Sequence, residues 1–253
     1  MTFVEAHQLT HHFFTEKGVT TALKDVSFTI HEGEFISFIG PSGCGKSTLL
    51  SIIARLITPT IGTLTLPPST DIGYMLQQDF LFPWKTIEEN ILLGLTLQGK
   101  EKKQIVDDLL TEFNLVHTRE LYPLQLSGGM RQRIALARTL AVNPHLLLLD
   151  EPFSALDFRS KLALENFVFE TLKAYSKTAI LVTHDISEAI AMSDKIYLFS
   201  DRPGTITQTF IVPEQIRKQL PFDARNDPLF QSLFQMIWKE LDQNGRQDPT
   251  KTI

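Results

Sequence analysis

The chain has 253 residues, of which 43% are hydrophobic and 21% are charged, a composition typical of a soluble globular protein that can bury its own core. The single cysteine, Cys44, excludes an intrachain disulfide, and a net charge of −5 with scattered Lys and Arg argues against a nucleic-acid partner. No apolar run reaches the roughly 18 residues of a membrane span, and the N-terminus lacks a signal-peptide pattern, so any membrane role is expected to come through a partner.

The first predicted elements are strands. Residues 22–30 alternate apolar and polar positions, a turn follows at residues 31–33, and residues 34–39 form a more apolar run that ends at Gly40. This second run has the character of a central strand that is buried on both faces.

A glycine-rich loop follows that strand and precedes a predicted helix over residues 46–56. Residues 40–48 match G-x-x-x-x-G-K-[ST], the pattern of a loop whose main-chain N–H groups hold phosphates. Lys46 is expected to bridge the terminal phosphates of a nucleotide, and the Ser47 hydroxyl to bind Mg²⁺. The candidate nucleotide-binding residues of this loop are Gly40, Pro41, Ser42, Gly43, Cys44, Gly45, Lys46, Ser47 and Thr48.

A second turn of the same kind lies in the middle of the chain. After short predicted strands at residues 62–66 and 71–76, the period becomes helical from about residue 101 to residue 141. Within that region the run Leu126-Ser-Gly-Gly-Met130 opens a strongly periodic helix, and such a turn can hold an anion with its N–H groups. It has no lysine, and the chain already contains a complete phosphate loop.

Two later apolar runs, residues 145–149 and 178–182, are typical of buried parallel strands, with a helix over about residues 159–175 between them. Carboxyl ends of parallel strands face the ligand crevice of an α/β sheet. At these ends we expect Asp150 to hold Mg²⁺, Glu151 to polarise a water against a γ-phosphate, and His184 to contact that phosphate.

Taken together, these motifs resemble the nucleotide-binding subunit of an ATP-binding cassette (ABC) transporter. The resemblance rests on the phosphate loop, residues 126–130, the run Leu149-Asp-Glu-Pro-Phe-Ser-Ala-Leu-Asp157 and Thr183-His184, and covers roughly residues 3–213. It implies an α/β fold: a P-loop NTPase (RecA-like) core with an antiparallel β subdomain and an inserted α-helical subdomain. The implied ATPase domain is 1–213 with the insert at about 90–142, and residues 214–253 form a helical tail, with one amphipathic helix at about 228–241 and no separate regulatory domain.

The resemblance also assigns roles to residues outside the phosphate loop. Gln77, favoured over Gln78 by its distance from Phe82-Pro83, resembles the glutamine that touches both the Mg²⁺ site and the transporter. Phe13 or Phe14 would stack on adenine; Phe13 fits the usual distance better, and both could instead be core residues.

The same resemblance explains the second turn through a two-fold dimer. Ser127, Gly128 and Gly129 would close over the γ-phosphate held by a second copy of the chain. Each copy then gives Lys46, Asp150, Glu151 and His184 to one site, and residues 127–129 to the other.

The implied activity is ATP hydrolysis, with ATP and Mg²⁺ as ligands, coupled to solute uptake through separate integral-membrane permease subunits. The implied location is the cytoplasmic face of a bacterial cell membrane, with an extracytoplasmic solute-binding protein as an indirect partner. Residues 80–87 resemble the region that receives a permease helix, and Pro83-Trp84 resembles the nitrate, sulfonate, taurine and thiamine-precursor (pyrimidine-precursor) importer group. Phe80, Phe82 and Trp84 could instead pack within the insert; we expect at least one to be exposed.

Two other functions compete with this interpretation. One is a soluble ABC ATPase acting on nucleic acid or ribosomes, but such relatives carry long coiled coils or two fused cassettes, which this sequence lacks. The other is an unrelated P-loop kinase or GTPase, which residues 126–130 disfavour.

Overall fold

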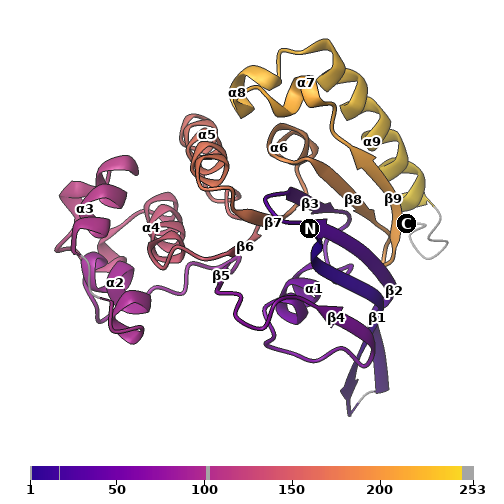
Figure 1. The fold of residues 1–253 in the computed structure, drawn as a ribbon, viewed down its shortest axis with the longest axis horizontal. Coiled ribbons are helices and arrows are strands. Elements are labelled where there is room, and N and C mark those ends of the chain that lie inside the picture. Colours follow the sequence, from indigo (N-terminus) through magenta and orange to yellow (C-terminus); the bar gives the residue numbers. More distant parts are fainter. Residues whose placement is uncertain (1, 17, 101–102, 247–253) are drawn as a thin grey trace.

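The computed structural model describes residues 2–16, 18–100 and 103–246, which form two β-sheets and a set of surrounding helices (Figure 1). The antiparallel sheet has the order β2-β1-β4, and the mixed sheet has the order β5-β6-β7-β3-β8-β9. Only β9 runs antiparallel to its neighbour in the mixed sheet. The strands are β1 (Thr2–Thr15), β2 (Gly18–His31), β3 (Phe35–Ile39), β4 (Ile61–Thr65), β5 (Ile72–Met75), β6 (Leu146–Asp150), β7 (Thr178–Thr183), β8 (Lys195–Phe199) and β9 (Ile206–Ile211).

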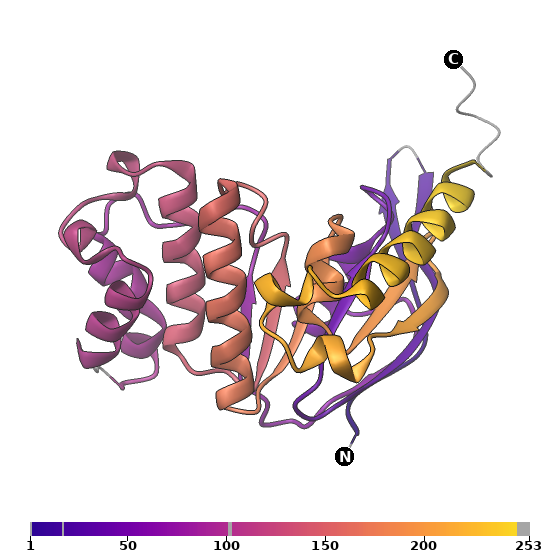
Figure 2. The ribbon, with the colours of Figure 1, turned by 90° about the horizontal axis from the view of Figure 1, so that it is seen from above.

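The helices divide into groups by their place in the chain. Those between β5 and β6 gather on the side of the molecule away from the antiparallel sheet, and α4 lies beside α5 (Figures 1 and 2). The helices are α1 (Lys46–Ile53), α2 (Ile87–Leu97), α3 (Lys103–Glu112), α4 (Gly128–Ala141), α5 (Phe158–Ala174), α6 (Ile186–Met192), α7 (Glu214–Arg217), α8 (Pro221–Ala224) and α9 (Pro228–Arg246), with short 3₁₀ turns at Val116–Thr118 and Pro123–Gln125.

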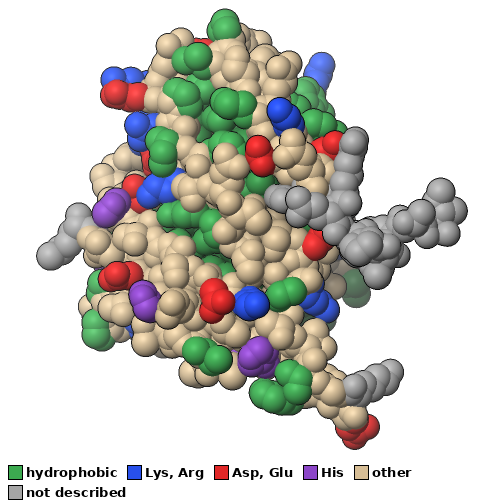
Figure 3. Space-filling view, turned by 90° about the vertical axis from the view of Figure 1, so that its right-hand side faces the viewer, with side chains coloured by type: hydrophobic (Ala, Val, Ile, Leu, Met, Phe, Trp, Pro, Cys, Tyr) green, Lys and Arg blue, Asp and Glu red, His purple; other side chains and the backbone are tan. Residues whose placement is uncertain are grey.

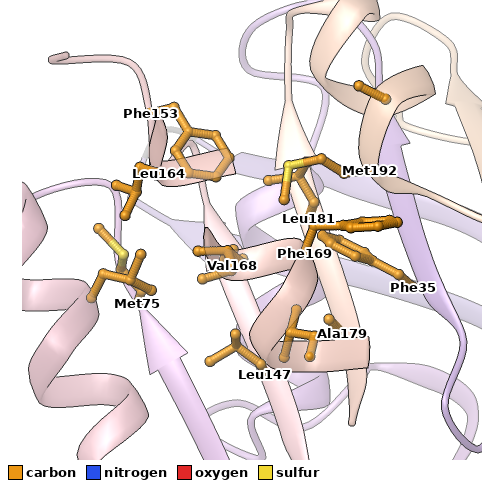
Figure 4. Packing of buried hydrophobic residues seen from close by; sticks show 14 of the residues in the cluster. Phe35, Met75, Leu147, Phe153, Leu164, Val168, Phe169, Ala179, Leu181 and Met192 are labelled. Carbon is orange, nitrogen blue, oxygen red and sulfur yellow. The ribbon is translucent and has the colours of Figure 1, made fainter. Parts of the chain in front are cut away.

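The central strands β3, β6 and β7 are buried at every residue because both faces of the sheet are covered. Alternate residues of a strand point to opposite faces. Accordingly, Leu147 and Leu149 belong to a cluster with α5 and α6, whereas Leu146 and Leu148 belong to a cluster with α1 and the antiparallel sheet. Figure 4 shows Val168 and other residues of α5 packed over the first of these faces.

The predicted strands and helices around the phosphate loop and the two later apolar runs are confirmed. The helical character expected from about residue 101 to residue 141 is confirmed in α3 and α4, and residues 113–127 between these helices form loops and short 3₁₀ turns. Strand β1 was not predicted, since repeated register shifts against β2 break its alternation, and β9 was not predicted because it leaves most residues exposed.

The surface shown in Figure 3 carries acidic and basic side chains that are interspersed rather than sorted by sign. This face therefore presents no block of positive charge of the kind that binds nucleic acid. In the part of the chain that the structure describes, no helix combines the length and the apolarity that crossing a membrane requires.

The C-terminal helices are attached to the core by apolar packing and by one buried ion pair. Phe230, Leu233 and Ile237 of α9 are buried in the cluster that contains α6. Arg225, just after α8, lies 2.6 Å from the carboxylate of Glu165 on α5, a side chain with no exposed surface. Burial raises the pKa of Glu165 to about 7, although the charge of Arg225 acts in the opposite direction. Residues 247–253 of the predicted tail lie outside the described residues.

This ion pair predicts a pH-dependent loss of stability in the variant Arg225→Met. Because the folded-state pKa of Glu165 is above its ordinary value, ionising this group costs stability as the pH rises from about 4.5 to about 7. Without Arg225 that cost grows. Urea titration should therefore show that the free energy of unfolding falls by about 3 kcal/mol at pH 8 and by clearly less at pH 5, where the carboxyl is protonated. Lys218→Met, which removes an exposed i,i+4 pair with Glu214, is the control and should leave stability nearly unchanged at both pH values. Equal losses for Arg225→Met at both pH values would contradict this account.

Candidate functional site

The phosphate loop connects β3 to α1 and is held in a tightly wound conformation. Gly45, the residue before α1, has a φ of 111°, and a Cβ there would lie 2.6 Å from the carbonyl oxygen of Ala22 on β2. A residue with a side chain would therefore be strained in its backbone and would clash. The loop can turn into the helix only because this position is a glycine.

Lys46 lies folded against the loop to which it belongs. Its Nζ donates hydrogen bonds to the carbonyl oxygens of Gly40 at 2.8 Å and Pro41 at 2.7 Å, and the residue is 6% exposed. Both acceptors are neutral, so these bonds satisfy the ammonium without neutralising it. The charge of Lys46 is therefore available to an anion in the loop.

Asp150 and Ser47 form a pair of oxygen groups beside this lysine. Burial raises the pKa of the Asp150 carboxyl and the neighbouring Glu151 raises it further, whereas a hydrogen bond with Ser47 and the charge of Lys46 lower it. A hydroxyl and a carboxylate in contact are ligands that Mg²⁺ prefers. These two residues thus fit a Mg²⁺ ion, which would supply positive charge to the phosphates.

Glu151 occupies a left-handed conformation, with φ of 49°, and is fixed by its main chain and by its side chain. Its carbonyl oxygen accepts hydrogen bonds from Gln132 Nε2 at 3.2 Å and Ser154 Oγ at 3.0 Å. Its carboxylate lies between Gln77 Nε2, at 3.2 Å, and His184 Nδ1, at 3.3 Å. A carboxylate held in this way can accept a proton from a positioned water.

Eight of the predicted site residues line one cavity of about 220 Å³. It is lined by Ser42, Gly43, Gly45, Lys46, Ser47, Thr48, Gln77, Glu151, Val182 and Arg202. Asp150 forms a hydrogen bond with Ser47 beside this cavity. His184 does not line it but contacts Glu151 from a neighbouring cavity of about 140 Å³. Cys44 is buried and does not line this cavity.

Ser127, Gly128 and Gly129 do not line the phosphate cavity. Ser127 caps α4, accepting a hydrogen bond from the N–H of Met130, and Gly128 lines a second cavity of about 460 Å³ that also contains Gln77 and Ala155. The two cavities share Gln77. Within one chain the turn at residues 127–129 therefore lies outside the cavity of the phosphate loop.

Two arginines of α4 hold the segment Phe80–Trp84, here named the 80–84 loop. Arg138 donates to the carbonyl oxygens of Asp79 at 2.8 Å and Phe80 at 2.9 Å, and Arg131 Nε lies 2.9 Å from the Asp79 carboxylate. The fully buried Asn90 of α2 binds both the N–H and the carbonyl of Phe82. The loop is thus fastened to the helical insert.

The expectation of at least one exposed aromatic in this loop is confirmed. Phe80 is 56% exposed and Trp84 is 70% exposed, whereas Leu81 is buried. Exposed aromatic side chains on a rigid loop are suited to contact another protein.

Phe13 and Phe14 both lie near the end of β1, outside the residues that line the phosphate cavity. Phe13 is 42% exposed and packs edge-on against His11, and Phe14 is 72% exposed. Stacking on adenine stays a prediction for either residue, and neither is a buried core residue.

Two polar contacts of the site were missed by sequence reasoning. Gln132 is buried within α4, and a polar residue on the apolar face of a predicted helix was the signal that could have found it. Arg202 follows the apolar strand β8, so a basic residue at a carboxyl strand end was the corresponding signal.

Comparison with known proteins gives a family match. A model described as ABC transporter matches residues 23–154. The chain is 59% identical to an uncharacterised ABC transporter ATP-binding protein, YtlC, of Bacillus subtilis (strain 168), covering 98% of each chain. It is 37% identical to the nitrate import ATP-binding protein NrtD of Synechocystis sp. (strain ATCC 27184 / PCC 6803 / Kazusa), covering 90% of each.

A solved structure shares the fold. The dimeric, post-hydrolysis state of the ATP-binding cassette MJ0796, bound to ADP and Pi, superposes with a TM-score of 0.75 at 31% identity, over 83% of this chain and 99% of the other. The predicted α/β P-loop fold class is therefore confirmed.

The Ser47–Asp150 pair predicts how Mg²⁺ affects nucleotide binding. Asp150→Asn keeps the shape of the side chain and removes its charge, so the gain in ATP affinity on adding Mg²⁺ should fall by roughly tenfold. Titration calorimetry with Mg²⁺ and with a chelator measures this gain. Asp223→Asn, at an exposed aspartate of α8, is the control. An undiminished Mg²⁺ effect in Asp150→Asn would argue against this metal site.

Proposed function

The chain belongs to the ABC transporter family, and from that premise we propose that it is the ATPase subunit of a solute importer that closes around ATP as a two-fold dimer. The observation that carries the proposal is Glu151, whose carboxylate is held between Gln77 and His184 at the edge of the phosphate cavity. Residues 1–213 form the proposed ATPase domain, with residues 214–253 as a helical tail.

Within one chain the proposed chemistry is positioning and proton acceptance. The phosphate loop and Lys46 would bind the nucleotide phosphates, while Ser47, Asp150 and Gln77 would hold Mg²⁺, which would supply positive charge beside the phosphates. Glu151 orients a water and accepts its proton, and His184 keeps the carboxylate in place and contacts the γ-phosphate. Lys46, with its charge unopposed by its two carbonyl partners, stabilises charge that develops on the phosphate oxygens.

The dimer is proposed because Ser127–Gly129 lie at the N-terminus of a 14-residue helix yet do not line the phosphate cavity of their own chain. In a head-to-tail pair they meet the γ-phosphate on the second copy. The dimeric form of the similar cassette MJ0796 supports this arrangement.

The membrane partner is proposed to bind at the 80–84 loop. The exposed Phe80 and Trp84 would receive a helix of a separate permease subunit, which places the ATPase on the cytoplasmic face of a bacterial membrane. An extracytoplasmic solute-binding protein would take part indirectly. We propose a solute of the nitrate, sulfonate, taurine or pyrimidine-precursor group; the similarity to a nitrate import protein supports this group.

The variant Glu151→Gln tests the role of the central carboxylate. It keeps the hydrogen-bonding shape and loses the proton acceptor, so ATP turnover should fall by about 10²- to 10⁴-fold while ATP-dependent dimers accumulate. Steady-state phosphate release and size-exclusion chromatography with ATP measure the two effects. Glu170→Gln, on the same chain at an exposed position of α5, is the control. Wild-type turnover in Glu151→Gln would remove Glu151 from the mechanism.

A mixing experiment tests whether sites are shared between chains. Lys46→Ala should bind nucleotide poorly, and Ser127→Arg should block the second turn, so each variant alone should be inactive. In an equal mixture half of the dimers are mixed and each has one intact site, so activity should recover to about a quarter of wild type. Activity no greater than that of either variant alone would contradict site sharing.

A further inference from the structure

Residues 200–205, here named the 200–205 loop, pack against strand β2 and the phosphate loop. The N–H of Gly204 donates to the carbonyl oxygen of Ala22 at 2.9 Å, and the N–H of Lys24 donates to the carbonyl oxygen of Gly204 at 3.0 Å. A Cβ on Gly204 would lie 2.1 Å from the carbonyl oxygen of Cys44. Two main chains can approach this closely only because Gly204 has no side chain.

The same loop is closed on itself by Ser200. Its Oγ donates toward the carbonyl oxygens of Asp201 at 2.8 Å and Pro203 at 3.0 Å, and accepts from the N–H of Thr205 at 3.0 Å. The main-chain bond from Ser200 to Thr205, at 2.9 Å, completes the ring. The backbone that carries Arg202 is therefore fixed relative to the phosphate loop.

Arg202 directs its side chain along the rim of the phosphate cavity. Its Nε donates to the carbonyl oxygen of Gly43 at 3.1 Å, and the residue lines the cavity together with Lys46, Ser47 and Thr48. The side chain is exposed. Within residues 2–16, 18–100 and 103–246, no carboxylate forms an ion pair with it, and its two terminal nitrogens donate to no protein group.

We propose that Arg202 binds phosphate oxygens of the nucleotide held by the phosphate loop of its own chain. Its Nε is already committed to the loop, which aims the two free terminal nitrogens and lowers the entropy lost on binding. A planar pair of N–H donors matches two oxygens of one phosphate. Ribose hydroxyls are neutral and would leave the charge of the guanidinium uncompensated, so phosphate is the better partner.

This inference rests on nucleotide binding as set out under the proposed function, and its test compares ligands that differ in phosphate. Affinities of ATP, ADP and adenosine are measured by calorimetry for wild type, Arg202→Gln and Arg202→Lys. Arg55→Gln is the matched control, because Arg55 is also exposed and also donates to main-chain carbonyls, but lies beyond the far end of α1. Thermal unfolding without nucleotide is measured for each variant.

Arg202→Gln should weaken ATP and ADP binding roughly tenfold and leave adenosine binding unchanged, while Arg202→Lys recovers part of the loss. The ratio of wild-type to variant ATP affinity should shrink as salt is raised from 50 to 500 mM, because charge contacts are screened; a loss caused only by a distorted loop would not respond to salt.

An unchanged ATP affinity in Arg202→Gln, or an equal loss for ATP and adenosine, would overturn the inference. If wild type itself binds no ATP, the proposed function fails instead, so the two failures are distinguishable. If Arg202→Gln unfolds at a lower temperature than Arg55→Gln, the nucleotide affinities of Arg202→Lys are compared with those of wild type instead. An unchanged ATP affinity in Arg202→Lys, or an equal loss for ATP and adenosine, then overturns the inference, and a loss for ATP and ADP alone supports it.

Discussion

The parallel register of β6, β7 and β3 is the constraint on which the site depends. Asp150 lies opposite Val182, and Ile39 lies opposite Thr183, so the three strands end together. The register holds because each strand is apolar on both faces and any slip would exchange the residues that face the two clusters. Asp150, Glu151, His184 and the phosphate loop therefore meet at one edge, although they come from distant parts of the chain.

Glu151 is contacted by residues from four different parts of the chain. Its left-handed backbone is held by the carbonyl contacts from Gln132 of α4 and Ser154, and its carboxylate by Gln77 after β5 and His184 after β7. A non-glycine residue at positive φ costs free energy that surrounding contacts must offset. Here those contacts come from the helical insert as well as the core, so the position of the carboxylate depends on where the insert lies.

The helical insert also connects the two surfaces that we propose to face other molecules. Helix α4 begins at the turn Ser127–Gly129, and its Arg131 and Arg138 bind the segment that leads into the 80–84 loop. Charge-assisted hydrogen bonds to main-chain carbonyls in a partly buried setting are stronger than neutral ones. A displacement of the turn by nucleotide on a second chain would therefore carry the 80–84 loop with it. The 200–205 loop contacts the phosphate loop through Gly204 at Cys44 and through Arg202 at Gly43.

Local sequence determined the phosphate loop, the Leu-Ser-Gly-Gly turn, the strand ends at Asp150 and His184, and the α/β class, because each of these has a signature within a few residues. Strand β1 and the edge strand β9 lacked such a signature, since register shifts in β1 and exposure in β9 erase the periodicity. Only the tertiary structure placed Gln132 on the Glu151 carbonyl, Arg138 on the 80–84 loop and Arg202 at Gly43. The last pair is 159 positions apart, and a contact between such distant residues is decided by how strands pair and helices pack, which no local pattern encodes.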